Sequence, residues 1–188
     1  MQISITIDKR QIRELKRELG DVATKRLPRE QEIIINKTAN DVHRKLGDAK
    51  TGIRSELSVT SPEAKKAIDK RRASRTRLSA TITVRKEKRI PLRAFKHRDL
   101  KRGVSYKTSP KTGTRKILDA FIPRPGGHIF RRHSSSRYPI ATLMGASPWG
   151  AVAKRGIKPR MVRFGEARLR KELDRRIARA VKKRQGVI

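Results

Sequence analysis

Positive charge constrains this chain more than any other feature of its sequence. Its 188 residues include 51 Lys and Arg but only 17 Asp and Glu, which gives a formal net charge of +34. A monomer with this charge repels itself strongly in water. We therefore expect the protein to lie beside a polyanion or inside an assembly that supplies negative charge. Hydrophobic residues make up 35% of the chain, so a core can still form.

Several classes of protein are excluded or disfavoured by composition. The chain has no cysteine, which excludes disulfides, zinc–thiolate sites and Cys nucleophiles. No apolar run approaches the roughly 20 residues that a spanning helix needs. The first eight residues lack the long apolar segment of a signal peptide. We therefore expect no membrane partner.

The periodicity of the apolar residues predicts an α+β fold. Residues 2–7 and 77–85 alternate apolar and polar side chains, which is typical of strands with one buried face. Residues 103–108 and 114–122 are predicted to form a hairpin around the turn at 109–113, and 128–130 predicts another short strand. These segments together indicate a small antiparallel sheet with a basic β-hairpin.

Helix start and stop signals divide the rest of the chain. Asp8 is placed to cap a first helix, which Gly20 could end, and Pro28 suits the first turn of a second helix, which Gly47 ends. Ser61 is placed to cap a short helix that ends in the basic residues at 70–72. Apolar residues every fourth position predict a long C-terminal helix over 161–184.

The predicted domain organisation is simple. We expect one α+β domain over residues 1–160, with a basic hairpin extension at about 85–118. A basic C-terminal helix at 161–188 is expected to pack on that domain. The segment 138–160 is rich in Pro and Gly, so we expect an ordered or docking loop there.

Catalytic chemistry has little support in the sequence. The chain contains four His, and His128 and His133 are separated by Arg131 and Arg132, whose charges oppose a metal dication. The few carboxylates are scattered, and no Gly-rich loop leads into Gly-Lys-Ser/Thr. We therefore expect a protein that is not an enzyme, with no catalytic residue, metal or cofactor.

Nucleic-acid binding fits the charge better. Residues 85–118 contain 13 Lys and Arg against two acids, a density suited to phosphate contacts. Tyr106, Phe95 and Phe130 are isolated in the sequence, so no stacking platform is expected. We expect contact with the backbone without sequence readout. The candidate backbone-contacting residues are Arg85, Lys86, Lys88, Arg89, Arg93, Lys96, Arg98, Lys101, Arg102, Lys107, Lys111, Arg115, Lys116, Arg131 and Arg132.

Composition alone leaves the polyanion open. A ribosomal or other RNA-binding structural protein would have the same charge balance, and so would a virion protein that contacts packaged DNA. A nuclease or another DNA-processing enzyme is a third, weaker interpretation.

Four short motifs in residues 119–150 narrow this choice. They read Asp-Ala-Phe-Ile at 119–122, Gly-His-Ile-Phe-Arg-Arg at 127–132, Arg-Tyr-Pro-Ile at 137–140 and Leu-Met-Gly-Ala-Ser-Pro at 143–148. In order and spacing they resemble the minor tail protein Z family of tailed bacteriophages and prophages, also called tail completion proteins. The chain departs from that family at Ala146, where members often have Pro.

The resemblance implies a structural virion protein at the head–tail junction, made in the host cytoplasm and containing no cofactor. Its expected partners are other copies of itself in a six-membered ring, neighbouring tail-tube, tail-terminator or head-completion proteins, and the double-stranded DNA in the channel. The basic candidates named above would then face the lumen. The candidate subunit or neighbour-ring contacts are Arg137, Tyr138, Pro139, Ile140, Leu143, Met144, Pro148 and Trp149.

The charge of such a ring would exceed that of the DNA inside it. Six copies would carry +204 together, whereas a ring about 50 Å tall encloses DNA with only about 30 charges. Part of the positive charge is therefore expected to face acidic neighbours or solvent. The segment at 137–149 is poor in charge and Pro-constrained, which favours a contact, but it could instead cover its own core.

Overall fold

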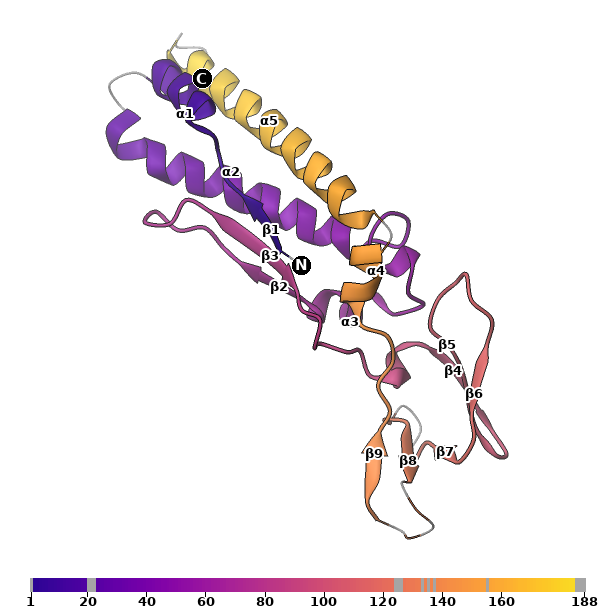
Figure 1. The fold of residues 1–188 in the computed structure, drawn as a ribbon. Coiled ribbons are helices and arrows are strands. Elements are labelled where there is room, and N and C mark those ends of the chain that lie inside the picture. Colours follow the sequence, from indigo (N-terminus) through magenta and orange to yellow (C-terminus); the bar gives the residue numbers. More distant parts are fainter. Residues whose placement is uncertain are drawn as a thin grey trace. The chain divides into compact units, whose positions relative to one another are not determined.

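The computed structural model describes residues 2–19, 23–123, 127–132, 134, 136, 138–154 and 156–184. Helices and small antiparallel sheets confirm the α+β class, and the last helix is long (Figure 1). The contacts divide the chain into two compact units. Unit 1 consists of Leu46–Ile68 and Val84–Ile157, and unit 2 consists of Gln2–Lys45, Asp69–Thr83 and Lys158–Ile188.

The sheet of unit 2 follows the order β1-β3-β2, with β1 at Gln2–Ile5, β2 at Ile68–Arg71 and β3 at Ala80–Val84. Strands β1 and β3 are antiparallel, and Ile3 lies opposite Ile82. Both predicted alternating strands are confirmed, because every second side chain of β1 and β3 is buried.

Strand β2 overturns one expectation. The helix predicted to run from Ser61 into the basic residues at 70–72 ends at Lys66, and Thr60 rather than Ser61 is its N-cap. The basic segment forms β2 instead, because pairing with β3 supplies its backbone hydrogen bonds and buries Ile68.

Helix α1 (Lys9–Leu19) begins at the predicted cap. The Asp8 Oδ1 atom accepts a hydrogen bond from the Gln11 amide at 2.8 Å, and Gln11 Oε1 accepts one from the Asp8 amide at 3.2 Å. This reciprocal pair is a capping box. The predicted stop at Gly20 lies outside the described residues.

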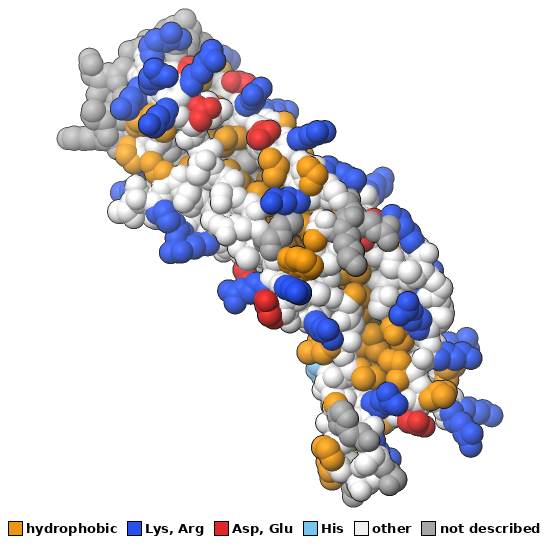
Figure 2. Space-filling model, viewed as in Figure 1, with side chains coloured by type: hydrophobic (Ala, Val, Ile, Leu, Met, Phe, Trp, Pro, Cys, Tyr) orange, Lys and Arg blue, Asp and Glu red, His pale blue; other side chains and the backbone are white. Residues whose placement is uncertain are grey.

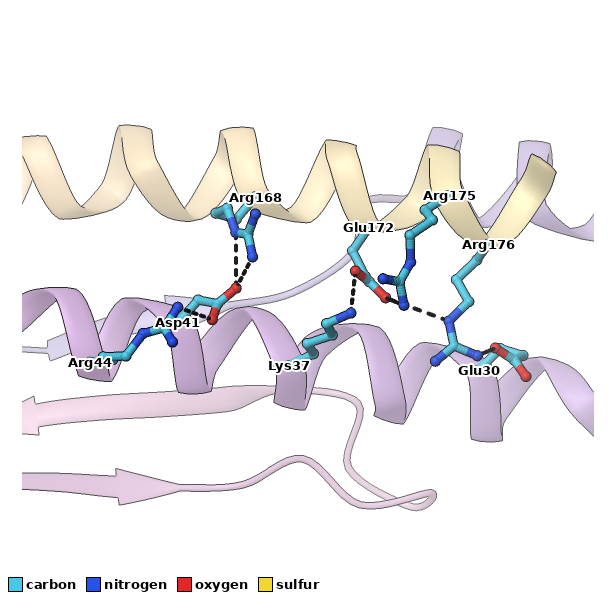
Figure 3. A network of polar contacts seen from close by, with 8 residues as sticks. All are labelled: Glu30, Lys37, Asp41, Arg44, Arg168, Glu172, Arg175 and Arg176. Atoms are coloured by element: carbon cyan, nitrogen blue, oxygen red, sulfur yellow. Dashed lines mark hydrogen bonds and ion pairs between the residues drawn. The ribbon is translucent and has the colours of Figure 1, made fainter. Parts of the chain in front are cut away.

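Helix α2 (Ala23–Leu46) begins five residues before Pro28, so Pro28 lies inside the helix and not in its first turn as predicted. A proline there removes one backbone hydrogen bond from the helix. Burial on both sides offsets that loss, because α2 lies between α5 and the strands β2 and β3 (Figures 1 and 3). Ile34 and Ile35 are both fully buried, and the helix ends just before Gly47, as predicted.

Helix α5 (Ile157–Arg184) begins four residues before the predicted start. It buries Ile157, Met161, Leu169 and Leu173, which recur every fourth residue or its multiple. Gly165 continues this stripe. A Cβ atom at Gly165 would lie 3.3 Å from Val42 Cγ2 of α2, so the glycine allows the two helices to approach closely.

Unit 1 contains two further three-stranded antiparallel sheets. The first joins β4 (Lys96–Leu100), β5 (Gly103–Lys107) and β6 (Arg115–Ile117); the second joins β7 (Ala120–Phe121), β8 (Phe130–Arg132) and β9 (Ile140–Thr142). The unit also includes α3 (Ser61–Lys66), α4 (Pro148–Lys154) and 3₁₀ turns at Ile53–Ser55 and Leu92–Ala94.

The predicted hairpin is confirmed in part, because β5 and β6 pair around the turn, but β6 ends at Ile117 instead of continuing to 122. Asp119 has a positive φ, and Ala120–Phe121 form β7 in the other sheet. Strand β4 was missed. The loop expected over 138–160 contains β9 and α4 and runs into α5, so that prediction was wrong for most of its length. Burial explains part of the difference, since Val152 of α4 is fully buried and Ala151 is nearly so.

Candidate nucleic-acid interface

The strand register sorts the basic residues of β4, β5 and β6 between two faces of their sheet. Directly opposed residues of an antiparallel pair share a face, and neighbours along a strand alternate. Arg98 lies opposite Ser105, which lies opposite Lys116, and Lys96 lies opposite Lys107. We call the face with Lys96, Arg98, Lys107 and Lys116 the basic face.

The basic face carries no acidic residue on its three strands. Lys96, Arg98 and Lys116 are exposed, and Lys107 is half-buried. Between them Ser105 is only 8% exposed, and its hydroxyl donates a hydrogen bond to the Arg98 carbonyl at 3.3 Å. Because the serine side chain is short and buried, the longer cationic side chains around it form the surface that a ligand can reach.

The opposite face of the same sheet is mixed. It contains Val104, which is fully buried, and the half-buried Ile117. His97, Tyr106 and Arg115 lie across this face in one row of the register. The exposed Asp99 also lies on this face, opposite Val104, so the one acidic residue of the three strands is kept off the basic face.

A groove of about 790 Å³ gathers four of the predicted residues. Lys101 and Arg102 come from the turn between β4 and β5, while Arg131 and Arg132 come from β8. The Arg132 guanidinium lies 5.1 Å from the centre of the Phe121 ring, which restrains it by a cation–π contact. Asp119, which has a positive φ of 59°, is the acidic residue in the groove lining.

The predicted cations that precede β4 lie outside both the basic face and the groove. The Ser147 hydroxyl donates hydrogen bonds to the carbonyls of Lys86 and Lys88, at 3.0 and 3.5 Å, and so ties this exposed segment to the loop before α4. Lys86 and Arg89 line a hollow beside Trp149. Arg93 lines a different hollow together with two lysines of the basic face.

Not every predicted cation has its charge available. Lys111 forms an ion pair with Glu56, whose Oε1 atom lies 2.8 Å from Lys111 Nζ. Arg85 precedes the sheet, and Arg115 lies on its opposite face and lines the hollow beside Trp149, so neither lies on the basic face. The structure thus distributes 13 of the 15 candidates over the basic face, the groove, two hollows and an ion pair, while Arg85 and Lys88 lie on the exposed segment before β4.

The aromatic residues that are isolated in the sequence gain neighbours in the fold. Tyr106 and Trp149 line the same hollow, although they are far apart in the sequence. Phe130 lies beside Phe121, with 6.2 Å between the ring centres. A Cβ atom at Gly145 would lie 2.3 Å from the Phe95 ring, so Phe95 packs against that loop. These contacts join residues that are distant in the sequence, so no local sequence pattern predicts them.

The predicted contact residues fall into two groups. Tyr138 is 67% exposed, Met144 51% and Ile140 37%, so they leave apolar surface uncovered within unit 1. Pro139 is exposed as well, whereas Leu143 and Trp149 are half-buried and Pro148 is buried. Arg137 lies outside the described residues. From Tyr138 to Ala153 the sequence contains no charged residue.

Unit 2 contains more acidic residues than unit 1, and several of them pair with its Lys and Arg. Each unit has a net charge of +17, but unit 2 contains 11 acidic residues and unit 1 only six. Lys and Arg side chains are spread along the whole face shown in Figure 2, and acidic side chains are few there. In unit 2, acids join α2 to α5 in a row of ion pairs (Figure 3). The pairs are Asp41 with Arg168, Glu172 with Lys37, Arg175 and Arg176, and Glu30 with Arg176.

Glu172 is the centre of this row. It is 8% exposed, and its Oε2 atom lies 2.8 Å from Lys37 Nζ. Burial opposes ionisation, but the hydrogen bond from Lys37 and the charges of Lys37, Arg175 and Arg176 outweigh it and lower the pKa of Glu172. These cations therefore serve the helix pair and are less available to a nucleic acid.

Other kinds of site find no support in the part of the chain that the structure describes. No three His, Cys, Asp or Glu side chains there are grouped to hold a metal ion. Every helix formed by those residues is too short or too polar to cross a bilayer. Comparisons with protein-family models, curated proteins and solved structures found no match to this chain.

Proposed function

We propose that this protein is a non-enzymatic structural protein that binds the backbone of double-stranded DNA through its basic face. The observation that carries the proposal is the strand register, which groups Lys96, Arg98, Lys107 and Lys116 with no acid among them. Cations held on one rigid surface neutralise neighbouring phosphates without reading bases. Within unit 1, the groove adds four more cations, namely Lys101, Arg102, Arg131 and Arg132.

The proposed setting is the head–tail junction of a tailed phage, in a ring of the tail completion type. Support for this setting comes from the motifs over 119–150 that resemble the minor tail protein Z family. The uncharged segment 138–153 adds to it, because like-charged copies repel one another least where neither carries charge. Its exposed residues Tyr138, Ile140 and Met144 supply apolar surface for such a contact.

Neutralising the basic face tests the DNA proposal. A variant with Lys96, Arg98, Lys107 and Lys116 all changed to Gln should bind a short DNA duplex more weakly. If each residue contacts one phosphate, the slope of log affinity against log salt should become shallower by about 3.6. Binding is measured by fluorescence anisotropy over a series of salt concentrations.

The matched control neutralises four exposed residues of α5, namely Arg163, Arg170, Arg179 and Lys182, also to Gln. It removes the same net charge, so it should lower affinity slightly and keep the slope nearly unchanged. Equal slopes for both variants would show that only net charge matters and would reject the basic face as the binding surface. Preference for an RNA duplex over DNA would favour the ribosomal or RNA-binding alternative.

The setting is tested separately by electron microscopy of the protein in its assembly. We expect rings of six at the top of the tail with the basic face toward the lumen. Density for this protein elsewhere in the particle, or co-sedimentation with ribosomes, would contradict the proposed setting without affecting the salt experiment.

A further inference from the structure

A hollow of about 580 Å³ in unit 1 combines aromatic rings with positive charge. Trp149 and Tyr106 line it, and so do the exposed cations Lys86, Arg89 and Arg115. Its volume lies in the range of about 300–1,000 Å³ that small-molecule sites occupy. No acidic residue is among those that line it. A ligand that fits this lining has a flat apolar part and carries negative charge.

The aromatic and cationic groups are held close to each other. Tyr106 lies directly opposite Arg115 in the pairing of β5 and β6. The Nζ atom of Lys86 lies 5.7 Å from the centre of the Trp149 ring. The Ser147 hydroxyl bonds to the Lys86 carbonyl at 3.0 Å and joins the two segments that carry these side chains. Lys86 is exposed, so its charge can move from the ring to a phosphate when a ligand enters.

We propose that this hollow binds one unpaired nucleotide, with its base against Trp149 and Tyr106 and its phosphates beside Lys86, Arg89 and Arg115. Stacking on aromatic rings combined with nearby cations is how proteins hold single-stranded nucleic acid without reading its sequence. Bases inside a duplex keep their faces stacked on one another and cannot use these rings. The proposal rests on the proposed function only in taking a nucleic acid as the ligand.

The site is separate from the basic face. Tyr106 and Arg115 belong to the opposite face of the β4-β5-β6 sheet. Duplex binding and nucleotide binding therefore use different side chains and can be lost independently. An acidic peptide could also meet the three cations, but two flat rings beside them favour a nucleobase over a carboxylate side chain.

Trp149 is the single tryptophan of the chain, so its fluorescence reports directly on this hollow. We expect single-stranded oligothymidine to quench that fluorescence in a saturable way. A DNA duplex at the same phosphate concentration should bind without comparable quenching, and hexaglutamate should quench weakly. Equal quenching by the duplex, stronger quenching by hexaglutamate, or no quenching by oligothymidine would each overturn the proposal.

Substitution at Trp149 gives a second measurement that needs no intrinsic fluorescence. Trp149→Leu should lower the affinity for labelled oligothymidine by about 5- to 150-fold, while Trp149→Phe recovers most of the loss. Affinity for the labelled duplex should change less than about twofold in both variants. A parallel loss of duplex binding in Trp149→Leu would indicate a structural role and reject the nucleotide site.

The two proposals fail in different ways. If wild-type protein binds oligothymidine as expected but its duplex affinity is insensitive to the basic-face variant, the proposed function fails and this site stands. If the duplex experiment succeeds and oligothymidine gives no Trp149 response, the nucleotide site fails alone.

Discussion

Gly103→Ala should disrupt the β4-β5-β6 sheet and reduce DNA binding with it. The Gly103 φ angle is +101°, a conformation that L-residues rarely adopt. A Cβ atom there would lie 2.1 Å from the Ile117 carbonyl oxygen of the neighbouring strand, and backbone cannot move aside as a side chain can. The two effects together should cost about 3 kcal/mol or more of stability in this sheet.

Hydrogen exchange at the amides of Val104–Lys107 measures this effect within unit 1. A loss of about 3 kcal/mol corresponds to opening that is more than about 100-fold more frequent. Gly113→Ala is the control, because it lies in the turn of the same sheet and a Cβ there meets no atom within 4 Å. Exchange in Gly103→Ala that matches Gly113→Ala would contradict the expected strain.

Glu172→Gln should weaken the packing of α2 and α5 within unit 2. The substitution keeps the shape of the side chain but removes the carboxylate shared by Lys37, Arg175 and Arg176, of which Arg176 keeps its pair with Glu30. Losing one partner of a fully buried pair costs about 3–5 kcal/mol. Lys37 and Arg175 are 37% and 46% exposed, so water screens them and we expect a loss of about 1–2 kcal/mol.

The pH dependence of that loss identifies its cause. The folded-state pKa of Glu172 lies below its ordinary value of 4.5, so its ionised form stabilises the fold above about pH 4.5. This contribution disappears as the pH falls through the lower folded pKa. The stability difference between wild type and Glu172→Gln, measured by urea unfolding, should be full at neutral pH and shrink in acid.

Glu166→Gln provides a matched control on the same helix, because Glu166 is exposed. It should change stability by less than about 0.5 kcal/mol at every pH. A Glu172→Gln deficit that stays constant from neutral pH down to about pH 3 would show that packing, and not charge, causes the loss.

Segments whose side chains are buried on one face were predictable from the sequence. The strands predicted at 2–7 and 77–85 show alternating apolar and polar residues in the sequence. The end of α2 before Gly47 follows a run of buried apolar residues. Strand β4 shows no such alternation, since its first four residues are all exposed. Strand β2 reads as the basic end of a helix because its pairing partner lies elsewhere in the chain.

The candidate interface was likewise predictable only where it did not depend on contacts between distant segments. Sequence alone located the cations of residues 85–118, because a count of charges needs no structure. It did not separate Lys96 and Arg98 from Arg115, since their faces depend on the register between strands. It also missed the shared hollow of Tyr106 and Trp149, which only tertiary packing brings together.

The discontinuous composition of unit 2 has a consequence for how the chain folds during synthesis. Its three segments are separated by both segments of unit 1, and α5 follows both of them in the chain. The residues of unit 1 therefore leave the ribosome as a group before α5 does. Until then the surface of α2 that receives α5, including Asp41 and Val42, is exposed. Unit 1 can therefore fold first, and pairing of α2 with α5 is a late step in maturation.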